Sequence, residues 1–143
     1  MKITSKKKKK QLIKEKVLWK VLNKKEIRDV EILKTWEAGI ILLGNEVKSI
    51  LKGNFDFKNS FVFIDRNQEV FLTNFKITIS QKQTQRERNY KLLLNRSEIK
   101  LLQRKKEEKK LIIIPTQIYL KKNKIKMEIA LGKRKRKYEK ERK

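Results

Sequence analysis

The sequence predicts a mainly β protein in which short antiparallel strands form one small barrel flanked by one or two helices. Three observations lead to this fold class. Short apolar runs alternate with polar turn segments through most of the chain. The last of these runs alternates regularly between apolar and charged residues, as a half-buried hairpin does. Finally, 143 residues suffice for one hydrophobic core but not for two.

The first expected elements are a strand and a short helix. Apolar residues at even spacing predict a strand over residues 30–36, and the apolar run Ile40–Leu43 ends at Gly44. Residues 46–51 then have the composition of a short helix, which Gly53 would end.

A hairpin and a further strand are expected next. Phe61–Ile64 and Val70–Leu72 flank the polar segment 65–68, a pattern typical of two strands and their turn. Phe75–Ile79 predicts another strand, and the polar segment Gln81–Asn89 is expected to be a loop.

A longer helix is expected from Arg96 to about Lys109. Asn95 stands at the cap position, and Glu98 has the spacing at which an acid can reach back to the free N–H groups of the first turn. The apolar residues cluster early in this segment, so residues 104–110 are expected to face solvent.

The final hairpin is the clearest element. Its expected core positions are Ile112, Ile114, Ile118 and Leu120 on one strand and Ile125, Met127, Ile129 and Leu131 on the other. The turn is expected at residues 121–123. Pro115 cannot donate a hydrogen bond to a ladder, so its strand is expected to be an edge strand or to bend there.

Together these elements predict an OB-fold-like antiparallel β-barrel of about six strands with flanking helices. The expected organisation is a basic flexible N-terminal arm at 1–22, the barrel at 23–131 and a short basic tail at 132–143. Five consecutive lysines in the arm repel one another, so a helix around Trp19 is expected only where the arm meets a surface.

The composition indicates a polyanionic partner and argues against catalysis. Lys and Arg number 41 against 16 acids, a formal net charge of +25, which RNA, DNA or an anionic membrane would neutralise. The chain has no cysteine and no histidine, and therefore lacks thiolates and the commonest general base and metal ligand. Its paired acids at 107–108 and 139–141 lie in basic segments and look like charge balance, so we expect no enzyme, metal or cofactor.

Apolar stretches such as Leu111–Ile114 fall far short of the roughly 20 residues needed to span a bilayer. The segment 12–22 is interrupted by charges and cannot serve as the core of a secretion signal. We therefore expect a cytoplasmic protein. An organellar location stays open because residues 1–14 contain no acid.

Several motifs share the order and spacing of one protein family. They are Asn23-Lys24-Lys25, Trp36-Glu37-Ala38-Gly39-Ile40, Gly44 with Glu46-Val47-Lys48-Ser49, the run Arg88–Asn95, Glu98-Ile99, Ile114-Pro115, Ile118-Tyr119, and Lys126–Leu131 with Lys133. In these residues the chain resembles the SmpB family over roughly residues 21–140.

The resemblance implies an OB-like barrel that binds the tRNA-like domain of transfer-messenger RNA (tmRNA, also called SsrA). It further implies delivery of this RNA to stalled ribosomes for rescue and peptide tagging, which is trans-translation. The implied partners are tmRNA and the ribosome and, indirectly, alanyl-tRNA synthetase and elongation factor Tu. We expect a monomer that binds no membrane.

The same resemblance implies RNA contacts at Glu37, Leu93 and Asn95, and each residue has an alternative role. Glu37 could form a salt bridge to Lys34 or Lys48. Leu93 could belong to the core, and the Asn95 side chain could cap the helix that follows.

Nine further residues complete the expected RNA-binding set: Asn23, Lys24, Lys25, Lys48, Arg88, Lys91, Lys133, Lys135 and Arg136. The basic ones are expected to contact phosphates if they lie on the RNA face, and otherwise to be solvated charges. Trp19, Trp36 and Tyr90 could stack on bases, although the strand position of Trp36 favours the core.

The C-terminus departs from the family pattern. A glycine of the family appears as Arg134 and an arginine as Glu141, and the sequence ends at Lys143 where the family continues into a basic tail that becomes helical in the empty mRNA channel. We therefore expect tmRNA binding with weak sensing of that channel. Composition alone would also allow a basic ribosomal protein, a general RNA-binding protein, or a membrane-surface role through residues 6–22.

Overall fold

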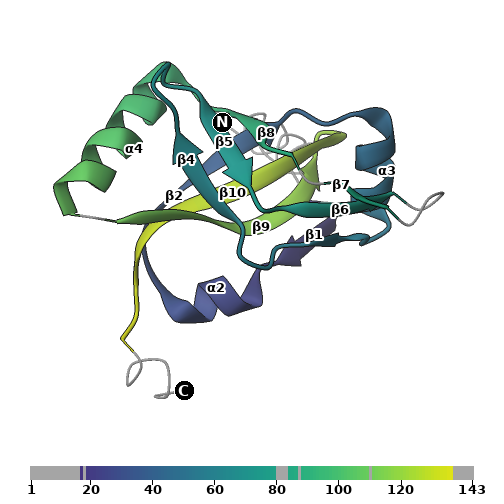
Figure 1. The fold of residues 1–143 in the computed structure, drawn as a ribbon, viewed down its shortest axis with the longest axis horizontal. Coiled ribbons are helices and arrows are strands. Elements are labelled where there is room, and N and C mark those ends of the chain that lie inside the picture. The colour runs from purple at the N-terminus through teal and green to yellow at the C-terminus, as the bar shows by residue number, and fades with distance from the viewer. Residues whose placement is uncertain (1–16, 18, 80–83, 87, 110, 137–143) are drawn as a thin grey trace, which may run out of the picture.

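The computed structural model describes residues 17, 19–79, 84–86, 88–109 and 111–136. Its main sheet is antiparallel, with seven strands in the order β1-β9-β10-β2-β8-β5-β4. In that order the strands are Trp19–Leu22, Ile112–Lys121, Lys124–Arg134, Val30–Ile40, Tyr90–Leu93, Val70–Thr73 and Phe61–Ile64. The strand β4 contacts β9, so the sheet curls into a barrel (Figure 1).

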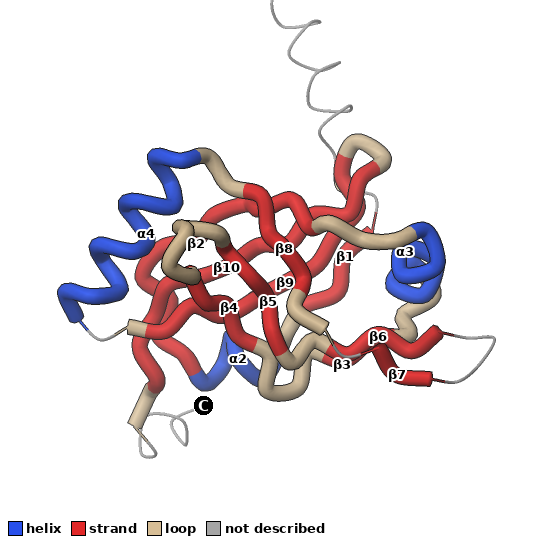
Figure 2. The backbone as a smooth tube through the Cα atoms, turned by 45° about the horizontal axis from the view of Figure 1, so that its top comes forward, coloured by secondary structure: helices blue, strands red, loops and turns tan. Residues whose placement is uncertain are grey.

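A smaller sheet and three helices complete the described fold. The small sheet has the order β3-β6-β7, with strands Phe55–Asp56, Lys76–Ile79 and Thr84–Arg86. The helices are α2 (Lys24–Asp29), α3 (Gly44–Leu51) and α4 (Arg96–Lys109). Figures 1 and 2 show α3 and α4 at opposite ends of the barrel, while α2 contacts β2 and β9.

The core fills the barrel with inward-facing apolar side chains. Its fully buried members include Leu72, Tyr90, Ile118, Met127 and Ile129. Because successive strand residues point to opposite faces, their neighbours in sequence point outward. The outer face of the sheet is thereby available for function.

The hairpin of β9 and β10 is one of the two longest pairings among the described strands, together with β10 and β2. Lys122 and Asn123 have φ of 52° and 60°, as a two-residue turn that follows strand twist requires. Gln117 pairs with Glu128 while Pro115 pairs with Ile129, so Thr116 is an extra residue in β9. The predicted bend at Pro115 is therefore confirmed as a bulge.

The bulge corrects the predicted alternation along β9. Ile113, not Ile112 or Ile114, belongs to the main core. Ile114 instead packs with Val30 and Ala130 in a second small cluster on the other face. One extra residue reverses the facing of every side chain beyond it, and a regular pattern cannot reveal this.

The predicted OB-fold-like antiparallel barrel is confirmed, and its main sheet has seven strands where about six were expected. Most predicted elements are confirmed, and four features need correction. Residues 19–22 are a strand of the main sheet and neither a helix nor part of an arm. The expected loop at 81–89 contains β7, and the short helix α2 was not predicted. The sheet also continues to Arg134, beyond the expected barrel end at Leu131.

Candidate nucleic-acid interface

The outer face of the main sheet carries the candidate site in two adjacent rows. In one row, Gln117, Glu128 and Glu37 are neighbours on β9, β10 and β2. The next row crosses five strands through Lys20, Tyr119, Lys126, Gly39 and Leu93. Side chains paired across antiparallel strands share one face, so both rows form one continuous surface.

Glu37 is held in place by two donors. The Tyr119 hydroxyl donates to Glu37 Oε2 at 2.7 Å, and Lys121 Nζ lies 3.1 Å from the same oxygen. Burial by itself would raise the pKa of Glu37, but these hydrogen bonds and the charges of Lys121 and Lys126 outweigh it and lower the pKa. The carboxylate is therefore ionised at neutral pH. Both donors bond Oε2, and no described residue donates a hydrogen bond to Oε1, which is available as an acceptor.

The donor Tyr119 stays protonated over the whole physiological range. Burial is the main cause that raises the pKa of its phenol, and the neighbouring Glu37 carboxylate raises this pKa further. Sequence reasoning placed neither Tyr119 nor Lys121 in the site. Both side chains reach Glu37 from β9 across β10, and this proximity depends on the β9–β10–β2 register, which cannot be deduced from the sequence.

A hollow of about 490 Å³ opens beside Glu37. It is lined by Val17, Trp19, Lys20, Glu37, Gln117, Tyr119 and Lys121. Half-buried Trp19 also packs edge-on against Phe55, with ring centroids 6.2 Å apart, so it serves the core and the hollow together. The hollow combines one fixed acceptor with donors and an aromatic wall, which suits the edge of an unpaired base.

The alternative salt bridges of Glu37 are wrong. Its partner is Lys121, whereas the Lys34 ammonium lies 5.2 Å from the Trp36 ring centroid. Lys48 is exposed on α3. The predicted core position of Trp36 is confirmed, since only 7% of its surface is exposed.

Leu93 is 52% exposed, so its core alternative is wrong. It sits opposite Gly39, where an added Cβ would lie 3.4 Å from Leu93 Cβ. Leu93 and Gly39 also line a shallow hollow of about 360 Å³ with Lys126. Leu93 therefore presents apolar surface to solvent beside the basic residues of this sheet face.

Asn95 begins α4 through its backbone. Its N–H donates to Glu98 Oε1 at 3.0 Å, and its carbonyl accepts from Ile99 N–H at 3.0 Å. The Asn95 side chain is exposed and makes no hydrogen bond to the described residues. The alternative of a side-chain cap is therefore wrong, and the amide is available to a ligand.

Arg88 and Lys91 differ in their availability. Arg88 bonds both carboxylate oxygens of Glu46 at 2.7 and 3.2 Å and lies 4.2 Å from the Tyr90 ring centroid. Glu46 is fully buried, so Arg88 neutralises a buried charge. Lys91, by contrast, makes a looser ion pair with Glu69 at 3.5 Å, and both side chains are more than two-fifths exposed.

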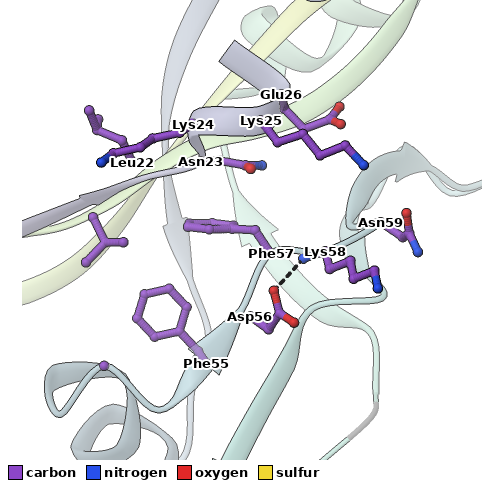
Figure 3. Close-up of a pocket in the computed structure, with 12 residues that line it drawn as sticks. Leu22, Asn23, Lys24, Lys25, Glu26, Phe55, Asp56, Phe57, Lys58 and Asn59 are labelled. Atoms are coloured by element: carbon purple, nitrogen blue, oxygen red, sulfur yellow. Dashed lines mark hydrogen bonds between the residues drawn. The ribbon is translucent and has the colours of Figure 1, made fainter. Parts of the chain in front are cut away.

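Asn23, Lys24 and Lys25 lie apart from this face, at the start of α2. Asn23 is buried, and its Nδ2 donates to Pro115 O at 2.8 Å, which ties α2 to the β9 bulge. A hollow of about 330 Å³ lies beside them. Figure 3 shows Lys24, Lys25 and Lys58 around it and the hydrogen bond from Lys58 N–H to Asp56.

The C-terminal basic residues also lie near α2. Lys135 N–H donates to Asp29 O at 3.0 Å, and Arg134 pairs with Glu26 at 3.2 Å. Lys133 and Arg136 are exposed. The predicted residues thus form two groups, one around Glu37 and Leu93 and one around α2. The tail from residue 137, including Glu141, lies outside the described residues.

The described residues hold no group of three or more acids arranged for a metal ion. Among the described helices, none is long and apolar enough to cross a membrane.

The fold and these surfaces define a small, strongly basic β-barrel with an RNA-suited sheet face. The chain matches the model of the SmpB protein family over residues 20–143. It therefore belongs to the SmpB family.

Relatives named "SsrA-binding protein" cover most of the chain. That of Persephonella marina is 48% identical over 82% of this chain and 80% of its own length. That of Aquifex aeolicus is 45% identical over 84% and 79%. A solved structure described as "tmRNA-SmpB: a journey to the center of the bacterial ribosome" contains a similar chain, with TM-score 0.67, 36% identity and coverage of 87% and 90%.

Proposed function

We propose that this protein binds the tRNA-like domain of tmRNA and brings it to stalled ribosomes for rescue and peptide tagging. Membership of the SmpB family and the SsrA-binding relatives support this function. The further partners would be alanyl-tRNA synthetase and elongation factor Tu, which act on the charged RNA. The protein would act in the cytoplasm as a binding protein without chemistry of its own.

The observation that carries the proposal is the fixed, ionised Glu37 on a basic face beside exposed Leu93. Phosphates repel a carboxylate, so a protein that bound RNA only through its phosphates would gain no affinity from Glu37. A carboxylate can instead accept hydrogen bonds from base amines or ribose hydroxyls. Glu37, Leu93 and Asn95 would recognise the RNA, and Lys91 and Lys126 would hold its phosphates.

Sequencing the RNA that copurifies with the native protein tests this function. We expect strong enrichment of tmRNA, and loss of this enrichment in a Glu37→Gln, Leu93→Ser double variant. A Lys52→Gln variant, which changes an exposed charge at the end of α3, serves as the matched control. Recovery of bulk ribosomal RNA alone would contradict the proposal and favour a basic ribosomal protein.

A further inference from the structure

The hairpin of β4 and β5 carries aromatic side chains on its outer face. Val62 and Leu72 point into the core, while Phe63 and Phe71 lie outside the core cluster. The two phenylalanines are direct cross-strand partners, and their rings stack with centroids 5.7 Å apart at 28°. Both are only partly buried, and nearby Phe61 is 44% exposed.

This pair continues the candidate RNA face. Phe71 pairs with Lys91 on β8, and Ile41 N–H donates to Lys91 O at 3.0 Å. Phe63, Phe71 and Lys91 therefore form a row two residues from the row that contains Leu93. The surface that begins at Glu37 thus extends without interruption to the far edge of the sheet.

Core packing does not explain these two aromatic rings. Outward positions of a half-exposed strand are ordinarily polar, and each exposed aromatic ring leaves apolar area in water. A ring face next to a cation is the combination that stacks unpaired bases. Lys91 can exchange its exposed 3.5 Å contact with Glu69 for a phosphate.

We propose that Phe63 and Phe71 form a platform on which an unpaired base of the bound RNA stacks, with Lys91 holding the adjoining phosphate. The occupant is RNA because the platform is continuous with the face around Glu37 and the chain carries a net charge of +25. This inference rests on the proposed function and adds a stacking site to it. The platform is tolerant of sequence, since every base has a π face.

The test compares two double variants of the full chain. Phe63→Leu with Phe71→Leu keeps the apolar surface and removes the ring faces, whereas Phe63→Tyr with Phe71→Tyr keeps the rings. The probes are the tRNA-like domain of tmRNA, a short oligouridylate, and an RNA duplex without unpaired nucleotides. We expect the leucine variant to bind the first two on the order of ten-fold more weakly. Duplex binding should not change, and the tyrosine variant should match the parent.

Ultraviolet cross-linking gives a second readout. In the parent complex, mass spectrometry should find a nucleotide attached to the peptide containing Phe63 or Phe71. Equal binding of both RNAs by the leucine variant, without such a cross-link, would overturn the platform. Concentration-dependent self-association that the leucine variant abolishes would also overturn it, by making the face a dimer contact.

The same experiment separates failure of the platform from failure of the proposed function. A parent chain that does not prefer the tRNA-like domain over unrelated RNA refutes the proposed function. In that case the affinities of the parent and the leucine variant for oligouridylate still test whether Phe63 and Phe71 stack on a base. A parent with that preference, and a leucine variant that retains full affinity, refutes the platform alone.

Discussion

The ion pair of Arg88 and Glu46 offers a sharp test of which basic residues are structural. Arg88 was expected among the RNA contacts, yet its guanidinium bonds both oxygens of a carboxylate that has no exposed surface. The substitution Arg88→Met keeps an unbranched apolar stem and removes the guanidinium with its charge. We expect it to destabilise the fold while leaving the RNA affinity of the folded protein unchanged.

The size of the effect follows from what Glu46 loses and keeps. It loses two charged hydrogen bonds but keeps the one from Leu43 N–H at 2.8 Å. Breaking a fully buried pair typically costs about 3–5 kcal/mol. Because the Arg88 side chain is 36% exposed, we expect a loss of about 2–3 kcal/mol in the free energy of unfolding.

The destabilisation caused by Arg88→Met should depend on pH, and the ionisation of Glu46 sets the direction of this dependence. Burial raises the pKa of Glu46, but the Arg88 hydrogen bonds, the Leu43 N–H and the Arg88 charge lower it below its ordinary value. A depressed carboxyl pKa stabilises the fold above the unfolded-state pKa, and this stability is lost as pH falls through the folded-state pKa. Without Arg88, less counteracts the effect of burial, which disfavours the ionised Glu46 carboxylate. The difference in the free energy of unfolding between parent and variant should therefore shrink as the pH falls from about 7 to about 4.

Urea denaturation across this pH range measures the effect, and Arg66→Met in the exposed β4–β5 turn is the matched control. Filter binding at a temperature where both chains are folded measures RNA affinity. A variant as stable as the parent with weakened RNA binding would refute the structural assignment and restore Arg88 as a phosphate contact.

Three further predictions concern other parts of the chain. Gly132→Ala should lower the free energy of unfolding by about 1–3 kcal/mol, because its Cβ would lie 2.5 Å from Glu31 O; an unchanged melting temperature would contradict this. Tyr119→Phe should raise the pKa of Glu37 by removing a donor to its carboxylate, as NMR titration of that carboxyl group would measure; an unchanged pKa would contradict the assigned cause. Removing residues 1–16, which carry eight lysines and one acid, should flatten the salt dependence of RNA affinity without changing the discrimination between tmRNA and unrelated RNA; lost discrimination would show that this segment reads the RNA.

The sequence predicted those parts of the fold that have local signals. Alternation and turn residues located the β9–β10 and β4–β5 hairpins, and the Asn95–Glu98 spacing located the start of α4. The bulge at Thr116 has no such signal, because one extra residue shows itself only in the pairing with β10. β7 was missed because its sequence is polar throughout.

The candidate site was also predicted only in part. Glu37, Leu93 and Asn95 came from the family resemblance, and the structure leaves each side chain with an accessible polar or apolar group. Tyr119 and Lys121 could not be assigned from sequence, since they meet Glu37 only through strands far apart in the chain. The intramolecular pairing of Arg88 with Glu46 and of Asn23 with Pro115 could not be predicted either, because the burial of these partners is invisible in sequence.

The most direct test of the proposed RNA face is the affinity of Glu37→Ala for the tRNA-like domain of tmRNA, measured by filter binding together with thermal melting. Removing one positioned charged contact should weaken this binding by about 1–3 kcal/mol. The melting temperature should stay close to that of the parent, because the Glu37 side chain is 40% exposed. Unchanged affinity with a lowered melting temperature would contradict the account and make Glu37 a structural partner of Tyr119 and Lys121.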